Sequence, residues 1–144
     1  MKRRTARAPT LLLASKDKEL SRHVRTYLST MGLSSHGLVL IRNESEWQEA
    51  LNRERPRLVI LDDDISHGNG PTLLSALRRR SAEVLTVYLA EQHSLELERA
   101  VRQLGVLYYT EKPPDWDTLG RVLASVLSVH APAPSFSGAP SPDT

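Results

Sequence analysis

The sequence predicts an α/β fold in which helices cover both faces of a five-stranded parallel sheet. Five short apolar runs alternate with longer segments whose apolar residues recur at helical spacing. The runs are near-continuous in their apolar character, as in strands that are buried on both faces. Parallel strands need long crossovers, and right-handed helical crossovers place helices on both faces of a sheet. The expected architecture is therefore a doubly wound sandwich.

The predicted strands are short and rich in Val, Leu, Ile and Tyr. They are Thr10–Ala14, Leu38–Ile41, Leu58–Leu61, Val84–Leu89 and Val106–Tyr109. All lie within residues 10–130, a length that forms one ordinary domain with its own core. The domain boundary follows from composition, because residues 131–144 are mostly Pro, Ala, Ser and Gly and cannot bury enough surface to fold. We expect a disordered tail there, or a linker to a further domain.

Helix start and stop signals lie between the strands. The first helical stripe runs from Leu20 to Met31 and should end at Gly32. The second should begin after Asn43 as N-cap, with Glu46 three residues later.

The other three helices carry comparable signals. Gly70 and the following proline open the third, since proline is tolerated in a first turn. Gly105 should close the fourth, and Asp115 should cap the fifth.

Composition excludes several classes of protein. Apolar residues make up 40% and charged residues 25% of the 144-residue chain, which is typical of soluble globular proteins. No apolar run approaches the roughly 20 residues that span a bilayer. Cysteine is absent, so a disulfide framework and a cysteine-ligated metal are excluded. We expect a cytoplasmic protein without membrane contact.

The basic charge of the chain is concentrated at its start. The pI is about 9.1, but Lys2, Arg3, Arg4 and Arg7 supply four of the 19 basic residues. The rest of the chain has 15 basic and 17 acidic residues. Residues 1–9 are therefore interpreted as a solvated basic arm, and nucleic-acid binding through this arm is an alternative.

Polar residues follow the ends of the predicted strands. The ends are Ser15-Lys16-Asp17, Asp62-Asp63-Asp64, Leu89-Ala90-Glu91 and Glu111-Lys112-Pro113. The carboxyl ends of parallel strands meet at one edge of a sheet, where sites form in such folds. Neighbouring carboxylates on an extended strand point to opposite sides, so the acids that follow the third strand should not all share one site.

Two of these stretches resemble response-regulator receiver (CheY-like) domains. One runs from Pro56 to Asp62, with Gly70 eight residues after the aspartate; the other is Tyr109-Thr-Glu followed by Lys112 and proline. The resemblance covers residues 9 to 129 without a large insertion. It implies a flavodoxin-like (βα)5 fold and a role in two-component, phosphorelay signal transduction.

The resemblance also implies roles for individual residues. Asp62 matches the aspartate that accepts a phosphoryl group from a histidine kinase with the help of Mg²⁺, and Lys112 matches the family's lysine. Tyr109 matches an aromatic residue that changes rotamer on activation. Asp64 matches the position whose backbone carbonyl helps to bind the metal.

Three positions depart from the family pattern. Ser15 and Lys16 stand where relatives carry two acids, and Leu89 replaces a hydroxyl-bearing residue next to the small Ala90. Mg²⁺ prefers carboxylate oxygens, whereas two like unit charges about 4 Å apart repel by roughly 4 kcal/mol at an effective dielectric of 20. We expect Lys16 to pair with Asp62 in place of the metal. The prediction is a pseudo-receiver that is not an enzyme, needs no cofactor and acts by protein–protein interaction.

A working phosphorelay receiver is the first alternative. It would bind Mg²⁺ with Asp17 or Asp63 as a replacement ligand. The family resemblance also implies a partner-binding face on the fourth helix, fifth strand and fifth helix, where Tyr109 and Trp116 are candidate contacts. It leaves open a homodimer through that face. Trp116 could instead cover the edge of the sheet.

Two further groups of polar residues are expected to have no role in the site. His23 and His93 lie on separate segments without the spacing of metal ligands, and should be surface residues. The run Arg78-Arg79-Arg80 should be a solvated helix end that complements the helix dipole.

Overall fold

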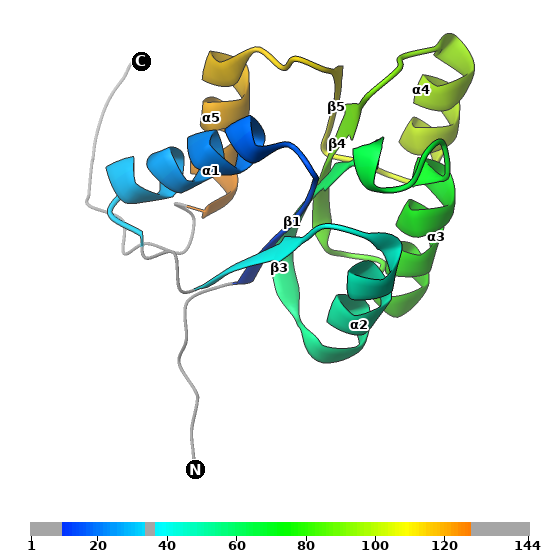
Figure 1. Ribbon diagram of the computed structural model, residues 1–144, viewed down its shortest axis with the longest axis horizontal. Coiled ribbons are helices and arrows are strands. Elements are labelled where there is room, and N and C mark those ends of the chain that lie inside the picture. The colour runs from blue at the N-terminus through cyan, green and yellow to red at the C-terminus, as the bar shows by residue number, and fades with distance from the viewer. Residues whose placement is uncertain (1–9, 34–36, 128–144) are drawn as a thin grey trace.

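A computed structural model describes residues 10–33 and 37–127, and they form one parallel sheet between two layers of helices (Figure 1). The strands are β1 (Thr10–Ala14), β2 (Leu38–Ile41), β3 (Pro56–Asp62), β4 (Leu85–Ala90) and β5 (Tyr108–Glu111). Their order in the sheet is β2-β1-β3-β4-β5, and every neighbouring pair is parallel. The predicted doubly wound α/β architecture is confirmed. The predicted arm at 1–9 and tail at 131–144 lie outside the described residues.

The five predicted helices are all present in the described chain. They are α1 (Lys18–Thr30), α2 (Glu44–Arg53), α3 (Gly70–Arg80), α4 (Leu95–Gln103) and α5 (Trp116–Leu127). A short 3₁₀ helix, Asp63–Ile65, follows β3 directly. Helices α1 and α5 cover one face of the sheet, and α2, α3 and α4 cover the other (Figure 1). Within the described ranges, no helix has the length and apolar character to cross a membrane.

The start and stop signals act as predicted. Asn43 Oδ1 accepts the backbone N–H of Glu46 at 2.8 Å and so caps α2. Asp115 Oδ1 accepts the amide of the second residue of α5. Gly32 and Gly105 adopt φ values of 75° and 83°, a left-handed conformation that ends α1 and α4.

Strand residues alternate between two apolar cores. One core holds odd-numbered residues of β1 with α1 and α5: Leu11, Leu13, Leu20, Val24, Leu58, Ile60, Val87, Leu89, Leu119 and Leu123. The other holds the intervening strand residues with α2, α3 and α4: Leu12, Ala14, Trp47, Val59, Leu61, Leu74, Tyr88, Ala90 and Val101. The same alternation continues beyond the ends of the strands. It therefore directs Asp62 and Asp63 to different sides.

Strand β5 begins two residues later than its apolar run. Val106 lies in the connection after Gly105 and packs against the core. Leu107 is 49% exposed. The apolar run Val106–Tyr109 therefore includes a core-covering loop as well as the start of a strand, and periodicity alone does not separate the two.

Candidate functional site

Asp62 lies at the centre of the polar cluster beyond the sheet. It is the last residue of β3, and its side chain is fully buried. Oδ2 accepts hydrogen bonds from Ser15 Oγ and Lys112 Nζ, both at 2.7 Å. Oδ1 accepts the backbone N–H of Asp64 at 3.1 Å. Both carboxylate oxygens of Asp62 therefore have donors from within the fold.

Lys112 supplies the cation of this cluster. It follows β5 directly, and its ammonium nitrogen contacts carboxylates from three other parts of the chain. The distances from Nζ are 2.7 Å to Asp62, 3.1 Å to Glu91, 3.3 Å to Asp17 and 3.5 Å to Asp64. An ammonium group has only three hydrogens, so it cannot donate a hydrogen bond to all four carboxylates at once. Its single positive charge is shared among four acids.

The prediction of an ion pair between Lys16 and Asp62 is wrong. Lys16 is exposed, and it contacts the cluster through its backbone N–H, which donates to the carboxylate of Asp64 at 3.0 Å. The alternation of β1 explains the error. Ser15 follows Leu11 and Leu13 on the side of the sheet where Asp62 lies, so the side chain of Lys16 points away from Asp62. Lys112 takes the role that the sequence assigned to Lys16.

Asp17 lies in the cluster although it comes one residue after Ser15 and Lys16, the two positions where the resemblance places acids. It caps α1, because Oδ1 accepts the amides of Glu19 at 2.9 Å and Leu20 at 3.3 Å. Its other oxygen contacts Lys112. Burial acts to raise the pKa of the Asp17 carboxyl, but the Leu20 amide and the Lys112 charge outweigh it and lower the pKa. One acid from the first strand-end is therefore present and ionised.

Asp63 belongs to the other side of the sheet, as strand alternation predicts. Its Oδ2 accepts a hydrogen bond from Tyr88 Oη at 2.8 Å, and its Oδ1 accepts the amide of Glu91 at 2.8 Å. Both oxygens are used there, so Asp63 is not placed to replace a metal ligand beside Asp62. Tyr88 was not among the residues predicted for the site. The sequence signal that could have identified it is a tyrosine within a buried strand, because a buried hydroxyl usually has a hydrogen-bond partner.

Tyr109 is held in place from three directions. Its ring is 7% exposed and stacks on Tyr88 with 5.7 Å between centroids. Its Oη lies 2.9 Å from His93 Nδ1, and the Arg102 guanidinium lies 5.7 Å from the ring centroid. His93, predicted as a plain surface residue, is exposed but makes this specific contact. Tyr109 therefore offers little surface of its own to a partner.

Leu89 is the cross-strand neighbour of Asp62 in the β3–β4 register. It is fully buried in the core formed with α1 and α5. Its side chain has no polar atom, so it cannot donate a hydrogen bond to a group on Asp62. The position that the resemblance assigned to a hydroxyl is a core position here.

Trp116 contacts the rest of the fold through its ring and its carbonyl. The ring stacks on His23 with centroids 3.7 Å apart and planes 6° apart. The carbonyl accepts a hydrogen bond from Tyr27 Oη. These contacts join α1 to α5, and the tryptophan is partly buried.

Arg78 corrects the prediction of a solvated arginine run. Its guanidinium donates to the carbonyl of Leu104 at 2.7 Å, the carbonyl of Val84 at 3.0 Å and Thr86 Oγ1 at 3.0 Å. The side chain is partly buried and joins α3 to the loops before β4 and β5. The next two residues of the run, Arg79 and Arg80, are exposed.

The electrostatics of the central pair follow from burial. Burial raises the pKa of the Asp62 carboxyl to about 6, although hydrogen bonds from Lys112 and Ser15 act in the opposite direction. Burial acts to lower the pKa of Lys112, but contacts with Asp62 and Glu91 outweigh it and raise the pKa. Lys112 is therefore a permanent cation near neutral pH, and Asp62 gains a proton only in mild acid.

Replacement of Asp62 by asparagine is expected to raise the free energy of unfolding at neutral pH by about 2 kcal/mol. A carboxyl whose pKa is raised from 3.8 to about 6 contributes stability below 3.8 that is lost as the pH rises through about 6. The lost charge-assisted bond to Lys112 offsets part of the gain. Urea unfolding across this pH range should show the difference between the two proteins growing with pH. A variant less stable than the wild type at neutral pH would mean that the ion pair outweighs burial.

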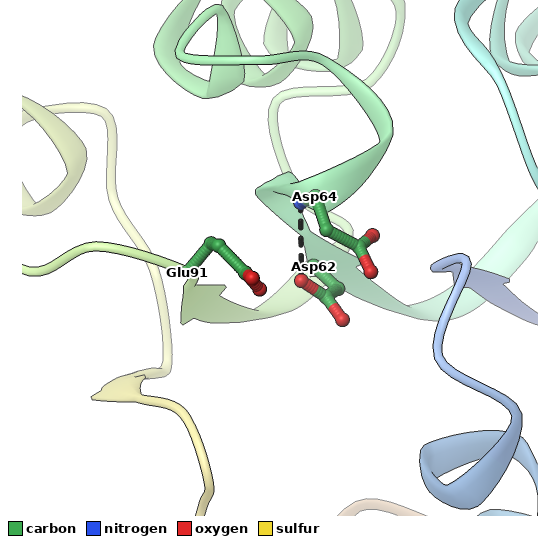
Figure 2. Close-up of side chains that lie close together, drawn as sticks. All are labelled: Asp62, Asp64 and Glu91. Atoms are coloured by element: carbon green, nitrogen blue, oxygen red, sulfur yellow. Dashed lines mark hydrogen bonds between the residues drawn. The ribbon is translucent and has the colours of Figure 1, made fainter.

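Three of the acids have the chemistry of a divalent-cation site. One carboxylate oxygen each from Asp62, Asp64 and Glu91 lie within 4.8 Å of one another. Figure 2 shows the three side chains gathered beyond the end of β3. Such oxygens suit Mg²⁺ or Ca²⁺. Lys112 contacts the same three groups, so an ion there would compete with its ammonium.

Comparisons with known proteins agree with this geometry. No family model and no curated protein sequence matches the chain. Solved structures match closely: a receiver domain protein from Methanospirillum hungatei JF-1 has a TM-score of 0.72 at 16% identity, covering 85% of this chain and 96% of that chain. The fold is that of a receiver domain.

Two further solved structures share the receiver fold. The signal receiver domain of an HD domain-containing protein from Pseudomonas fluorescens Pf-5 has a TM-score of 0.71 at 22% identity, covering 85% of this chain and 97% of that chain. A response regulator from Burkholderia pseudomallei, described with a phosphorylated aspartic acid, a calcium ion and citrate, has a TM-score of 0.66 at 15% identity. That match covers 82% of this chain and 66% of the Burkholderia chain. The predicted resemblance is confirmed at the level of fold.

Proposed function

We propose that the chain is a receiver-type module of bacterial-type signal transduction that works through protein contacts without phosphorylation of Asp62. The observation that carries the proposal is the state of the Asp62 carboxylate. It is fully buried, and both oxygens accept hydrogen bonds from Ser15, Lys112 and the Asp64 amide. Bond formation to a phosphoryl group would draw electron density from these oxygens and weaken their hydrogen bonds, which burial makes costly to replace.

Charge and core composition support the same proposal. Lys112 already neutralises part of the acidic cluster from within the chain. Leu89 offers no hydroxyl with which a phosphoryl group could be held. Tyr109 is fixed between Tyr88, His93 and Arg102. The module would then present one stable surface to its partner, and it would not be an enzyme.

A working phosphorelay receiver is the second candidate. It is favoured by the proximity of the Asp62, Asp64 and Glu91 carboxylates. Asp17 adds a fourth acid within reach of Lys112. In this case Mg²⁺ would supply the charge neutralisation at these acids, and a histidine kinase would supply the phosphoryl group to Asp62.

Incubation of the full chain with acetyl phosphate and Mg²⁺ separates the two candidates. We expect no mass increase of one phosphoryl group in the intact protein. We also expect no beryllofluoride-dependent amide shifts around β3 and β5. Asp62→Asn is the matched control, because it removes the acceptor oxygen and keeps a similar shape. A label present in the wild type and absent from this variant would establish the second candidate.

The partner is proposed to be a protein that contacts the face formed by α4, β5 and α5. Leu95 in α4 is 67% exposed and Trp116 in α5 is partly exposed. A second copy of the chain could occupy the same face as a homodimer. Nucleic-acid binding through the basic arm would involve residues 1–9, which the structure does not describe.

A further inference from the structure

A basic hollow of about 600 Å³ lies between the carboxyl-terminal ends of α2 and α3. The residues that line it are Leu51, Asn52, Glu54, Arg55, Pro56, Leu77, Arg79, Arg80 and Ser81. Leu51 and Leu77 are buried and form an apolar base, whereas the three arginines are exposed. The volume lies within the range of small-ligand sites.

The hollow is separate from the Asp62 cluster. Pro56, which lines it, is the first residue of β3, and Asp62 is the last. A strand of this length rises about 20 Å from end to end. The two sites therefore lie at opposite edges of the sheet, and a ligand in the hollow would not touch the acids.

The arginines of the hollow carry more positive charge than the groups around them offset. Within residues 10–33 and 37–127, no ion pair of Arg55, Arg79 or Arg80 is found. Glu54 supplies one opposing charge in the lining. The ends of α2 and α3 supply roughly another, at about half a charge each. Three guanidinium groups exceed these two charges, so the hollow has a net attraction for anions.

One arginine is already oriented for binding. Arg80 Nη2 donates a hydrogen bond to Asn52 Oδ1, which links the ends of the two helices. The neighbouring Arg78 is bonded to the carbonyls of Val84 and Leu104, which fixes the last turn of α3. A guanidinium held in this way loses less conformational entropy when it binds a ligand.

We propose that this basic hollow binds the phosphate groups of a small oligophosphate, either pyrophosphate or the phosphate chain of a nucleotide. Guanidinium groups pair with phosphate oxygens in bidentate geometry, and several arginines around one hollow suit more than one phosphate. None of the lining residues, all of which the structure describes, is aromatic. Phosphate is therefore the recognised group, because a base would lack a stacking surface.

Calorimetric titration of the full-length chain with pyrophosphate tests the proposal. We expect binding that weakens with added salt, and a loss of about tenfold or more in affinity for Arg79→Gln and for Arg55→Gln, since each removes a charge-assisted contact. Arg99→Gln in α4 is the matched control, an exposed arginine outside the hollow. It should leave the affinity within about twofold. Far-ultraviolet circular dichroism of each variant verifies that the fold is retained.

A second variant separates the hollow from the basic arm. Replacing Lys2, Arg3, Arg4 and Arg7 by alanine should leave pyrophosphate binding unchanged. ADP and pyrophosphate are compared in parallel: equal affinities identify free oligophosphate as sufficient, and tighter ADP binding identifies a nucleotide. Absence of pyrophosphate binding, equal loss in Arg99→Gln, or loss in the arm variant alone would overturn the proposal. Binding of duplex DNA without pyrophosphate binding would overturn it as well.

Discussion

Replacement of Lys112 by methionine is expected to lower the free energy of unfolding by about 3–5 kcal/mol at neutral pH. The variant keeps the length of the side chain but removes the ammonium group that contacts Asp17, Asp62, Asp64 and Glu91. Asp62 is fully buried, so its remaining hydrogen-bond donors within residues 10–33 and 37–127 would be the Ser15 hydroxyl and the Asp64 amide.

The loss should depend on pH in a defined direction. The Lys112 charge lowers the pKa of Asp62, so its removal raises that pKa above about 6. A raised carboxyl pKa gives stability that is present below the unfolded value of 3.8 and lost as the pH rises through the folded value. Urea unfolding should therefore show the largest deficit at neutral pH and the smallest near pH 4.

Two further variants identify the source of the effect. Lys16→Met is the matched control, because Lys16 is exposed; it should change stability by no more than about 0.5 kcal/mol. In Lys112→Met/Asp62→Asn the loss should be smaller than in Lys112→Met alone, since the unpaired buried charge is gone. Equal losses in the Lys16 and Lys112 variants would contradict the assignment of the cation. Mg²⁺ should stabilise Lys112→Met more than the wild type, because the ion no longer competes with the ammonium.

The order of elements and the capped ends of the helices could be predicted from the sequence because those signals are local. Apolar periodicity distinguishes strands from helices, and capping residues such as Asn43 act within a few residues of their own position. The edge of the sheet at which these polar residues meet could also be predicted, for a different reason. Strand ends of a parallel sheet lie together whatever the side chains are.

The pairing inside the site could not be predicted from local signals. Lys16 lies two residues after β1, which is a direct neighbour of β3, whereas β5 is separated from β3 by β4. Strand order alone therefore favours Lys16 as the partner of Asp62. Side-chain direction reverses that choice, because Ser15 is the inward residue and Lys112 reaches across the end of β4. The Asp63–Tyr88 bond likewise depends on the β3–β4 register, which a single sequence does not provide.

Replacement of Gly70 by alanine is expected to lower the free energy of unfolding by about 2–4 kcal/mol. A Cβ at this position would lie 1.7 Å from Tyr88 Oη, 2.8 Å from Tyr88 Cζ and 2.9 Å from Asp63 Cβ. Alanine ordinarily favours a helix by up to about 1 kcal/mol over glycine. The sign of the change is therefore decided by the clash, which urea unfolding measures directly.

The tyrosine cannot relieve this clash without cost. Its ring is fully buried and stacked on Tyr109, and its hydroxyl is the donor to the buried Asp63 carboxylate. A shift of the ring would remove this donor and leave the carboxylate, among the residues that the structure describes, with the Glu91 amide. Because Glu91 also contacts Lys112, we expect the amide shifts of the variant to change in the β4–α4 loop and at Lys112.

A double-mutant cycle isolates the close approach. Tyr88→Phe alone should cost about 1–3 kcal/mol, since it leaves a buried acceptor without one donor. It also removes the atom nearest to the new Cβ, so Gly70→Ala should cost at least about 1 kcal/mol less in the phenylalanine background. Gly32→Ala is the control: its Cβ would meet no atom of the described residues within 4 Å, and its φ of 75° sets the cost at about 1–2 kcal/mol. Additive losses in the cycle would show that the contact with the hydroxyl is not what requires glycine. A coupled result would mean that the Asp63–Tyr88 pair is fixed by packing, and with it the loop that carries Glu91 to the Asp62 cluster.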